Sequence, residues 1–77
     1  MNKDLQYYMG LNYEYLVRKL TAEEGGGYVI KIPILKGCMS DGDTLEEAFK
    51  NIEDAKQEWI SHMLERGYEV AEPSEDF

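Results

Sequence analysis

The chain has 77 residues, of which 16 are acidic and 8 basic, and a formal net charge of −8 at pH 7. This length allows one domain with a thin core, and the acidic surface would repel phosphate backbones, which disfavours direct nucleic-acid binding by this chain. No apolar run reaches the roughly 20 residues of a membrane helix, and the start, MNKDLQYYMG, lacks the apolar region of a signal peptide. Together with the lone Cys38, these features favour a cytoplasmic protein without a membrane partner.

The first half of the chain predicts a short helical turn followed by three strands. Gly10 stops the turn, and the run Gly25 to Gly27 permits a hairpin because glycine adopts positive φ without a steric penalty. Pro33 ends the second strand, since proline has no N–H to give to the ladder. The helical turn is expected at residues 2–9 and the strands at residues 13–20, 28–32 and 38–40.

The second half is dominated by one long amphipathic helix, expected from Thr44 to Arg66. Its apolar residues recur at steps of three and four from Leu45 onward. Either Asp43 or Thr44 can cap the helix, each with a glutamate three residues later, and Gly67 can close it. If Trp59 is the main anchor of this helix on the sheet, Trp59→Ala should cost about 3–5 kcal/mol.

The remaining residues complete an α+β order of β-β-β-α-β in one antiparallel sheet. Residues 68–71 are expected to form a fourth strand. The single domain then has an N-terminal segment 1–12, a core 13–71 and a polar tail 72–77. One helix covers only one face of a sheet, so the other face or an edge strand is expected to bind a second copy as a homodimer or larger assembly.

No group of residues has the spacing of a catalytic or metal site. Cys38 precedes the helix and His62 lies near its far end, so a Cys–His pair would have to bridge much of the helix. His62 has no second histidine or cysteine at ligand spacing, and the stretch that begins Asp41-Gly42-Asp43 matches a calcium loop poorly. The chain is therefore expected to be a non-enzyme without a metal or cofactor.

The stretch GGGYVIKIPILKGCMSDGDTLEEAFKNIEDAKQEWI resembles the HicB antitoxin family. The typical pattern is a glycine-rich hairpin, a strand ending in proline, then P-x-L-x-G-C, G-D-T-x-E-E-A and a helix ending near a tryptophan. The resemblance covers residues 13–73. The matching residues are Gly26, Gly27, Tyr28, Pro33, Leu35, Gly37, Cys38, Gly42, Asp43, Thr44, Glu46, Glu47, Ala48 and Trp59.

This resemblance implies a partial ribonuclease-H-like fold without catalytic carboxylates, assembled as a homo-oligomer. Members of the family neutralise HicA, a small basic toxin that cleaves messenger RNA, and cover its catalytic histidine. Many members carry a C-terminal DNA-binding domain; none follows Phe77, so operator binding by this chain alone is not expected.

Three functions remain open on the sequence. The first is an antitoxin that occludes a HicA-type toxin, and the second is a stand-alone dimeric module, regulatory or ligand-binding, with no toxin. The third, a residual hydrolase, lacks catalytic groups. For the first, the excess of acidic residues supplies the candidate partner-binding residues: Glu23, Glu24, Glu46, Glu47, Glu53 and Glu58.

Overall fold

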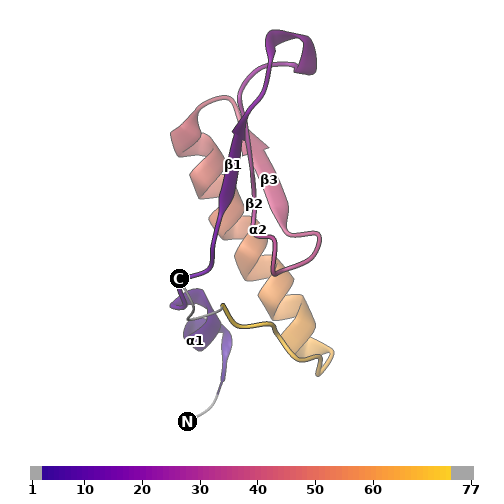
Figure 1. Cartoon of the computed structure of the whole chain (residues 1–77). Helices are drawn as coiled ribbons and strands as arrows, with labels where there is room; N and C mark the ends of the chain where they lie inside the picture. The colour runs from indigo at the N-terminus through magenta and orange to yellow at the C-terminus, as the bar shows by residue number, and fades with distance from the viewer. Residues whose placement is uncertain (1–2, 74–77) are drawn as a thin grey trace.

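The computed structural model describes residues 3–73 and shows a long helix beneath a small antiparallel sheet (Figure 1). Within those residues, no helix is both long and apolar enough to cross a bilayer. In chain order the elements are α1 (Leu5–Met9), β1 (Leu16–Lys19), the 3-10 helix η1 (Ala22–Glu24), β2 (Tyr28–Lys31), β3 (Met39–Gly42) and α2 (Leu45–Glu65).

The sheet is an antiparallel meander in the order β1-β2-β3, as predicted. β1 is four residues shorter than predicted and β2 one residue shorter, whereas β3 begins one residue later and ends two residues later. Successive side chains of a strand point to opposite faces. Ile30 faces α2 and is fully buried, whereas Val29 and Lys31 face the other side. Within residues 3–73, only the α2 side of the sheet is therefore covered by the chain itself.

α2 begins and ends within one residue of its predicted bounds. Thr44, not Asp43, is the N-cap, and its side chain accepts a hydrogen bond from the backbone N–H of Glu47 at 3.1 Å. The helix packs chiefly against β3, and also against β2 and α1. The buried helix residues are Ala48, Ile52, Lys56 and Ile60.

Trp59 lies at the margin of this contact and is not its main anchor. The ring is only partly buried, and its Nε1 donates a hydrogen bond to the carbonyl of Lys36 at 3.0 Å. Ile52 and Ile60, by contrast, are both 0% exposed. Trp59 therefore ties the turn before β3 to the helix, while the isoleucines carry most of the burial.

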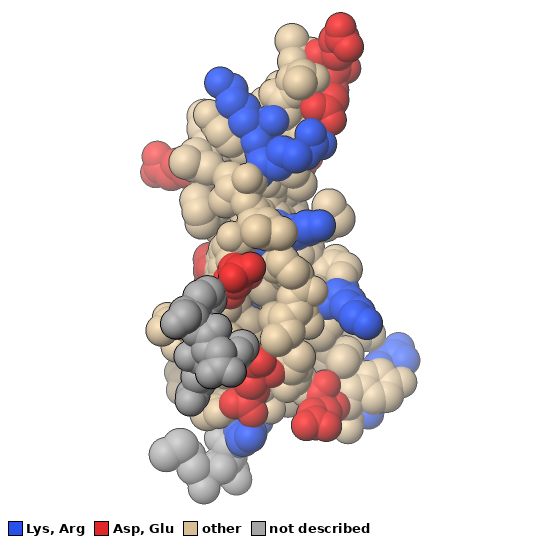
Figure 2. Space-filling model, viewed as in Figure 1, with Lys and Arg blue, Asp and Glu red and all other residues tan. Residues whose placement is uncertain are grey.

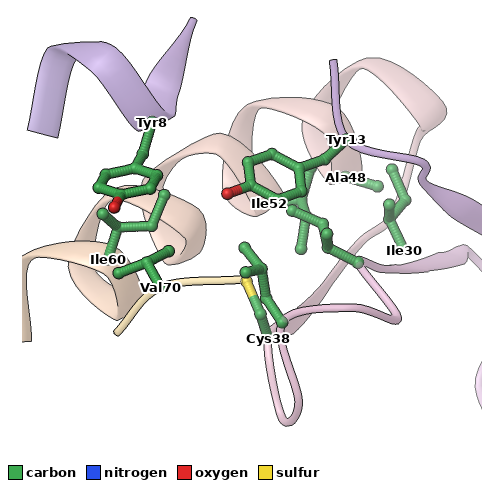
Figure 3. Close-up of a cluster of buried hydrophobic side chains, with 10 residues drawn as sticks. Tyr8, Tyr13, Ile30, Cys38, Ala48, Ile52, Ile60 and Val70 are labelled. Carbon is green, nitrogen blue, oxygen red and sulfur yellow. The ribbon is translucent and has the colours of Figure 1, made fainter. Parts of the chain in front are cut away.

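The N-terminal segment belongs to the core. Tyr8 of α1 is 5% exposed and lies beside Ile60 of α2 and Val70 of the C-terminal segment (Figure 3). α1 is capped by Asp4, whose carboxylate accepts from the backbone N–H of Tyr7 at 2.9 Å. Tyr8 of the N-terminal segment 1–12 thus packs with residues of the predicted core segment 13–71.

The predicted fourth strand was wrong, because residues 68–71 form no strand. Val70 is buried and Tyr68 is 55% exposed, although the two residues would lie on the same face of a strand. The carbonyl of Ala71 accepts a hydrogen bond from the Tyr13 hydroxyl at 2.6 Å rather than from a neighbouring strand. The kinship with ribonuclease H consequently stays a prediction.

The tail expected at residues 72–77 begins with an attachment to α1. Glu72 accepts hydrogen bonds from Lys3 Nζ at 2.7 Å and from the Tyr7 hydroxyl at 2.5 Å. Residues 74–77 lie outside the described part of the chain.

Two glycines of the sequence signature allow close contacts between elements. A Cβ on Gly42 would lie 2.5 Å from the backbone nitrogen of Ala48, and one on Gly27 would lie 2.5 Å from the carbonyl oxygen of Gly42. Gly27 also has a φ of +83°, which other residues rarely adopt. These glycines let the hairpin, the end of β3 and the first turn of α2 meet.

Candidate partner-binding surface

The two glutamates of the hairpin, Glu23 and Glu24, differ in the contacts that their side chains make. Glu24 forms an ion pair with Arg18 at 2.8 Å, and its carboxylate also accepts from the backbone N–H of Thr21 at 3.1 Å. Arg18 and Thr21 together lower the pKa of Glu24 to about 2. Glu23 is exposed beside it. Glu24 thus stabilises the hairpin through these contacts. A partner could therefore not bind the Glu24 carboxylate without breaking contacts that support the fold.

The hairpin capping box was missed from the sequence. Thr21 accepts from the backbone N–H of Glu24, and the Glu24 carboxylate accepts in return from Thr21. The signal was present as a threonine followed three residues later by a glutamate.

The four candidate glutamates of α2 do not all lie on one face of the helix. Glu46 and Glu47 are exposed in its first turn, where the helix dipole favours negative charge. Glu53 lies on the side toward β1 and accepts a hydrogen bond from the Tyr15 hydroxyl. Glu58 is exposed one turn before His62. These residues do not form one site.

Four carboxylates lie along the solvent face of α2, with Lys50 beside them between the first and the second, and two of the four were not among the candidate residues. Successive members are separated by seven, four and seven residues, which places them on one face of a helix. The row spans about 27 Å at 1.5 Å per residue. All its members are exposed, and we call it the acidic stripe: Glu47, Asp54, Glu58 and Glu65. The helical spacing of Asp54 and Glu65 could have identified them.

The acidic and basic side chains are unevenly placed on the face shown in Figure 2. Carboxylates mark the hairpin tip and then recur as separate spots over the molecule, while several cations gather just below the tip. β1 contributes Arg18 and Lys19 to this part of the surface. The hairpin is therefore electrostatically mixed.

Lys56 is a buried cation that the sequence analysis did not identify. Its side chain is 2% exposed, and its Nζ lies 3.2 Å from the Tyr15 hydroxyl and 3.4 Å from the carbonyl of Met9. The rings of Tyr13 and Tyr15 lie 5.2 and 5.6 Å from the ammonium, within cation–π range. Burial raises the pKa of Tyr13 to about 12, which keeps this hydroxyl protonated and able to donate to Ala71.

Cys38 and His62 lie closer together than the sequence suggested. Both line a shallow depression with Trp59 and Met63, because the turn before β3 lies over the C-terminal half of α2. The thiol is nevertheless only 3% exposed, burial raises its pKa, and the described structure records no hydrogen bond between the two side chains. A nucleophilic cysteine needs the opposite environment, so Cys38 is a core residue.

No metal site is evident in the described residues. Over residues 3–73, no three histidine, cysteine, aspartate or glutamate side chains gather as metal ligands would.

Comparison with known proteins places the chain in a family. Residues 13–75 match the family described as HicB-like antitoxin of bacterial toxin–antitoxin systems. A UPF0150 protein of Synechocystis sp. is 43% identical over 65 residues, which cover 84% of this chain and 76% of that protein. A UPF0150 protein of Thermoplasma acidophilum is 33% identical over 51 residues, covering 66% of this chain and 74% of the relative. No solved structure matches significantly. The chain therefore belongs to the HicB-like antitoxin family of bacterial toxin–antitoxin systems.

Proposed function

We propose that this chain is a cytoplasmic antitoxin that binds a small basic RNA-cleaving toxin of the HicA type and blocks its access to RNA. Family membership supports the toxin–antitoxin role. The observation that carries the mode of action is the acidic stripe, Glu47, Asp54, Glu58 and Glu65, on the solvent face of α2. A cationic RNA-binding surface would be attracted to this row as it is to RNA phosphate.

The chain acts in this proposal by occupying a surface and not by catalysis. The buried thiol of Cys38 and the raised pKa of that group leave it unsuited to nucleophilic attack at neutral pH. The acidic stripe lies on a rigid 21-residue helix whose opposite face is fixed in the core. A preformed surface of this kind loses little conformational entropy on binding.

An RNA-cleavage assay tests the proposal. The product of the neighbouring reading frame, if short, basic and histidine-containing, is the toxin to purify. Cleavage of a messenger RNA by that toxin should stop when this chain is added at about equal concentration, provided that binding is tight relative to the assay concentration. Unchanged cleavage at a large molar excess of the chain would contradict the proposal.

A second candidate is a stand-alone dimeric module, regulatory or ligand-binding, that has no toxin partner. It is favoured by the exposure of every residue of β1, which leaves an edge strand of the sheet open to another chain. Absence of a toxin-like neighbouring frame, together with self-association of the purified chain, would favour this candidate over the antitoxin.

A further inference from the structure

The face of the sheet opposite α2 carries a groove that is lined mostly by apolar side chains. Ile30 faces α2, so its neighbours Val29 and Lys31 point to the opposite side. Lys31 pairs with Leu16 on β1 and with Met39 on β3, which places all three side chains on this outer face. The volume of the groove is about 550 Å³, within the roughly 300–1,000 Å³ typical of small-ligand sites.

The apolar side chains form a strip that runs along the groove. Leu16 and Met39, on the two outer strands, are 46% and 56% exposed. Val29 of the central strand and Leu20, next to the hairpin, are half-buried. From Leu16 to Leu20 the strip is about 13 Å long, since each of the four steps along an antiparallel strand covers ~3.4 Å. An apolar ligand that covers this strip removes it from water, which is the main favourable contribution that such a surface makes to binding.

Two lysines lie at one end of this strip. Lys31 lines the groove, and Lys36 lines a second depression of about 280 Å³ that shares Lys31 and Met39 with the groove. Over the part of the chain that the structure describes, the ammonium of neither lysine takes part in an ion pair. Both side chains are exposed, so an anion at this end of the strip meets two positive charges.

The other charges of the groove set the direction of a bound ligand. Arg18 already pairs with Glu24 at 2.8 Å, so it offers less to an added anion than the lysines do. Asp41 lies opposite Val29 in the sheet register and on the same outer face. Its carboxylate repels an anion placed beside it. A negatively charged group is therefore favoured at the lysine end, with an apolar body that extends toward Leu20.

We propose that this groove binds a small organic anion with an elongated apolar body, of the class of medium-chain carboxylates. The ligand carboxylate lies between Lys31 and Lys36, and its alkyl chain covers Val29 and Leu20. The net charge of −8 repels anions in general, so a small anion without an apolar body is not retained. The site is on the other side of the sheet from α2 and does not rest on the proposed toxin binding.

Isothermal titration calorimetry of the full chain with octanoate tests the proposal. Octanoate should bind about tenfold more tightly than 1-octanol, which has the same chain length without the charge. Acetate, which has the charge without the apolar body, should give no binding heat at the same concentrations. Equal dissociation constants for octanoate and 1-octanol, or no binding of octanoate at millimolar concentration, would overturn the inference.

Substitutions at the lysine end of the strip locate the site. Lys31→Gln should raise the octanoate dissociation constant about tenfold. Met39→Glu should abolish binding, because it sets a carboxylate beside the bound anion. Met39 is 56% exposed, so the fold should accept this change, which circular dichroism checks. Lys50→Gln is the matched control, since Lys50 is an exposed lysine of α2, and it should bind octanoate as the wild type does.

Octanoate binding that neither Lys31→Gln nor Met39→Glu weakens would place the ligand elsewhere and overturn the inference. Two other occupants of the groove have distinct outcomes, both without octanoate binding by the wild type. A mass in sedimentation equilibrium that falls in Met39→Glu relative to the wild type would assign this face to a second copy. Inhibition of the cognate toxin that is lost in Met39→Glu would assign it to the toxin. Either result would overturn the inference, whereas the antitoxin proposal fails separately if the wild type does not inhibit RNA cleavage.

Discussion

Lys56 connects three segments of the chain from within the core. Its ammonium contacts the carbonyl of Met9 after α1 and the hydroxyl of Tyr15 before β1, while its own backbone belongs to α2. The surrounding tyrosine rings supply partial negative charge that offsets some of the cost of burying a cation. Hydrophobic periodicity does not predict a buried lysine among apolar helix positions. The contacts that compensate its burial come from residues that are 41 and 47 positions away in the sequence.

Two replacements of Lys56 distinguish the contribution of its polar contacts to stability from the contribution of the volume that its side chain fills. Lys56→Ala should lower the free energy of unfolding by about 2–4 kcal/mol, because it leaves a cavity and removes both contacts. Lys56→Met fills the space and should cost less, about 1–2 kcal/mol. Urea denaturation of the two variants measures the difference. Equal stability of Lys56→Ala and wild type would show that this cluster does not support the fold.

Glu24 gives the hairpin a pH dependence with a defined sign. Its pKa is about 2 in the folded chain against a usual value of 4.5, chiefly because of the bond from Arg18. A carboxyl with a lowered folded pKa stabilises the fold above its unfolded pKa, and that contribution is lost as pH falls toward the folded value. Glu24→Gln should therefore melt at a lower temperature than wild type at pH 7. The difference between the two melting temperatures should become smaller as pH falls from 4.5 to about 2. A difference in melting temperature that is unchanged at low pH would argue against a stabilising role of this ion pair.

At the scale of elements, the sequence predicted those helices and strands whose formation depends on local sequence pattern. The helix pattern from Leu45 onward specified α2 almost to the residue, because cap, periodicity and closing glycine agree. The prediction of a strand at residues 68–71 was wrong. Strand formation needs a partner strand, and Val70 instead packs beside Tyr8. Two members of the acidic stripe, Glu47 and Glu58, were among the candidate partner-binding residues, whereas Asp54 and Glu65 were not.

The relative weight of Ile60 and Trp59 tests how α2 is anchored. Ile60→Ala should cost about 2–5 kcal/mol, a large part of the roughly 4–12 kcal/mol that a chain of this size has in total. Trp59→Ala should cost less, about 1–3 kcal/mol, because the ring is only partly buried and the stabilisation scales with the area removed from water. Thermal melts of both variants provide the comparison. A Trp59 variant that melts well below the Ile60 variant would restore the tryptophan as main anchor.

At the scale of the whole molecule, the fold separates three surfaces. One face of α2 is buried against the sheet and α1, its opposite face carries the acidic stripe, and β1 leaves an edge of the sheet exposed. The net charge of −8 is therefore not spread evenly, since the hairpin brings Arg18 and Lys19 to the edge while the stripe contains only carboxylates. The acidic stripe and the exposed sheet edge thus belong to different elements of the chain.

The association rate with the cognate toxin tests the central claim most directly. The variant Asp54→Asn with Glu58→Gln and Glu65→Gln removes three charges of the acidic stripe, and Glu23→Gln at the hairpin is the control for a lost exposed carboxylate. Stopped-flow fluorescence at low ionic strength should show association slowed about tenfold in the stripe variant, with a weaker salt dependence, and little change in the control. Equal rates for the wild type and the stripe variant, with the same salt dependence, would contradict the claim that α2 is the toxin-binding surface.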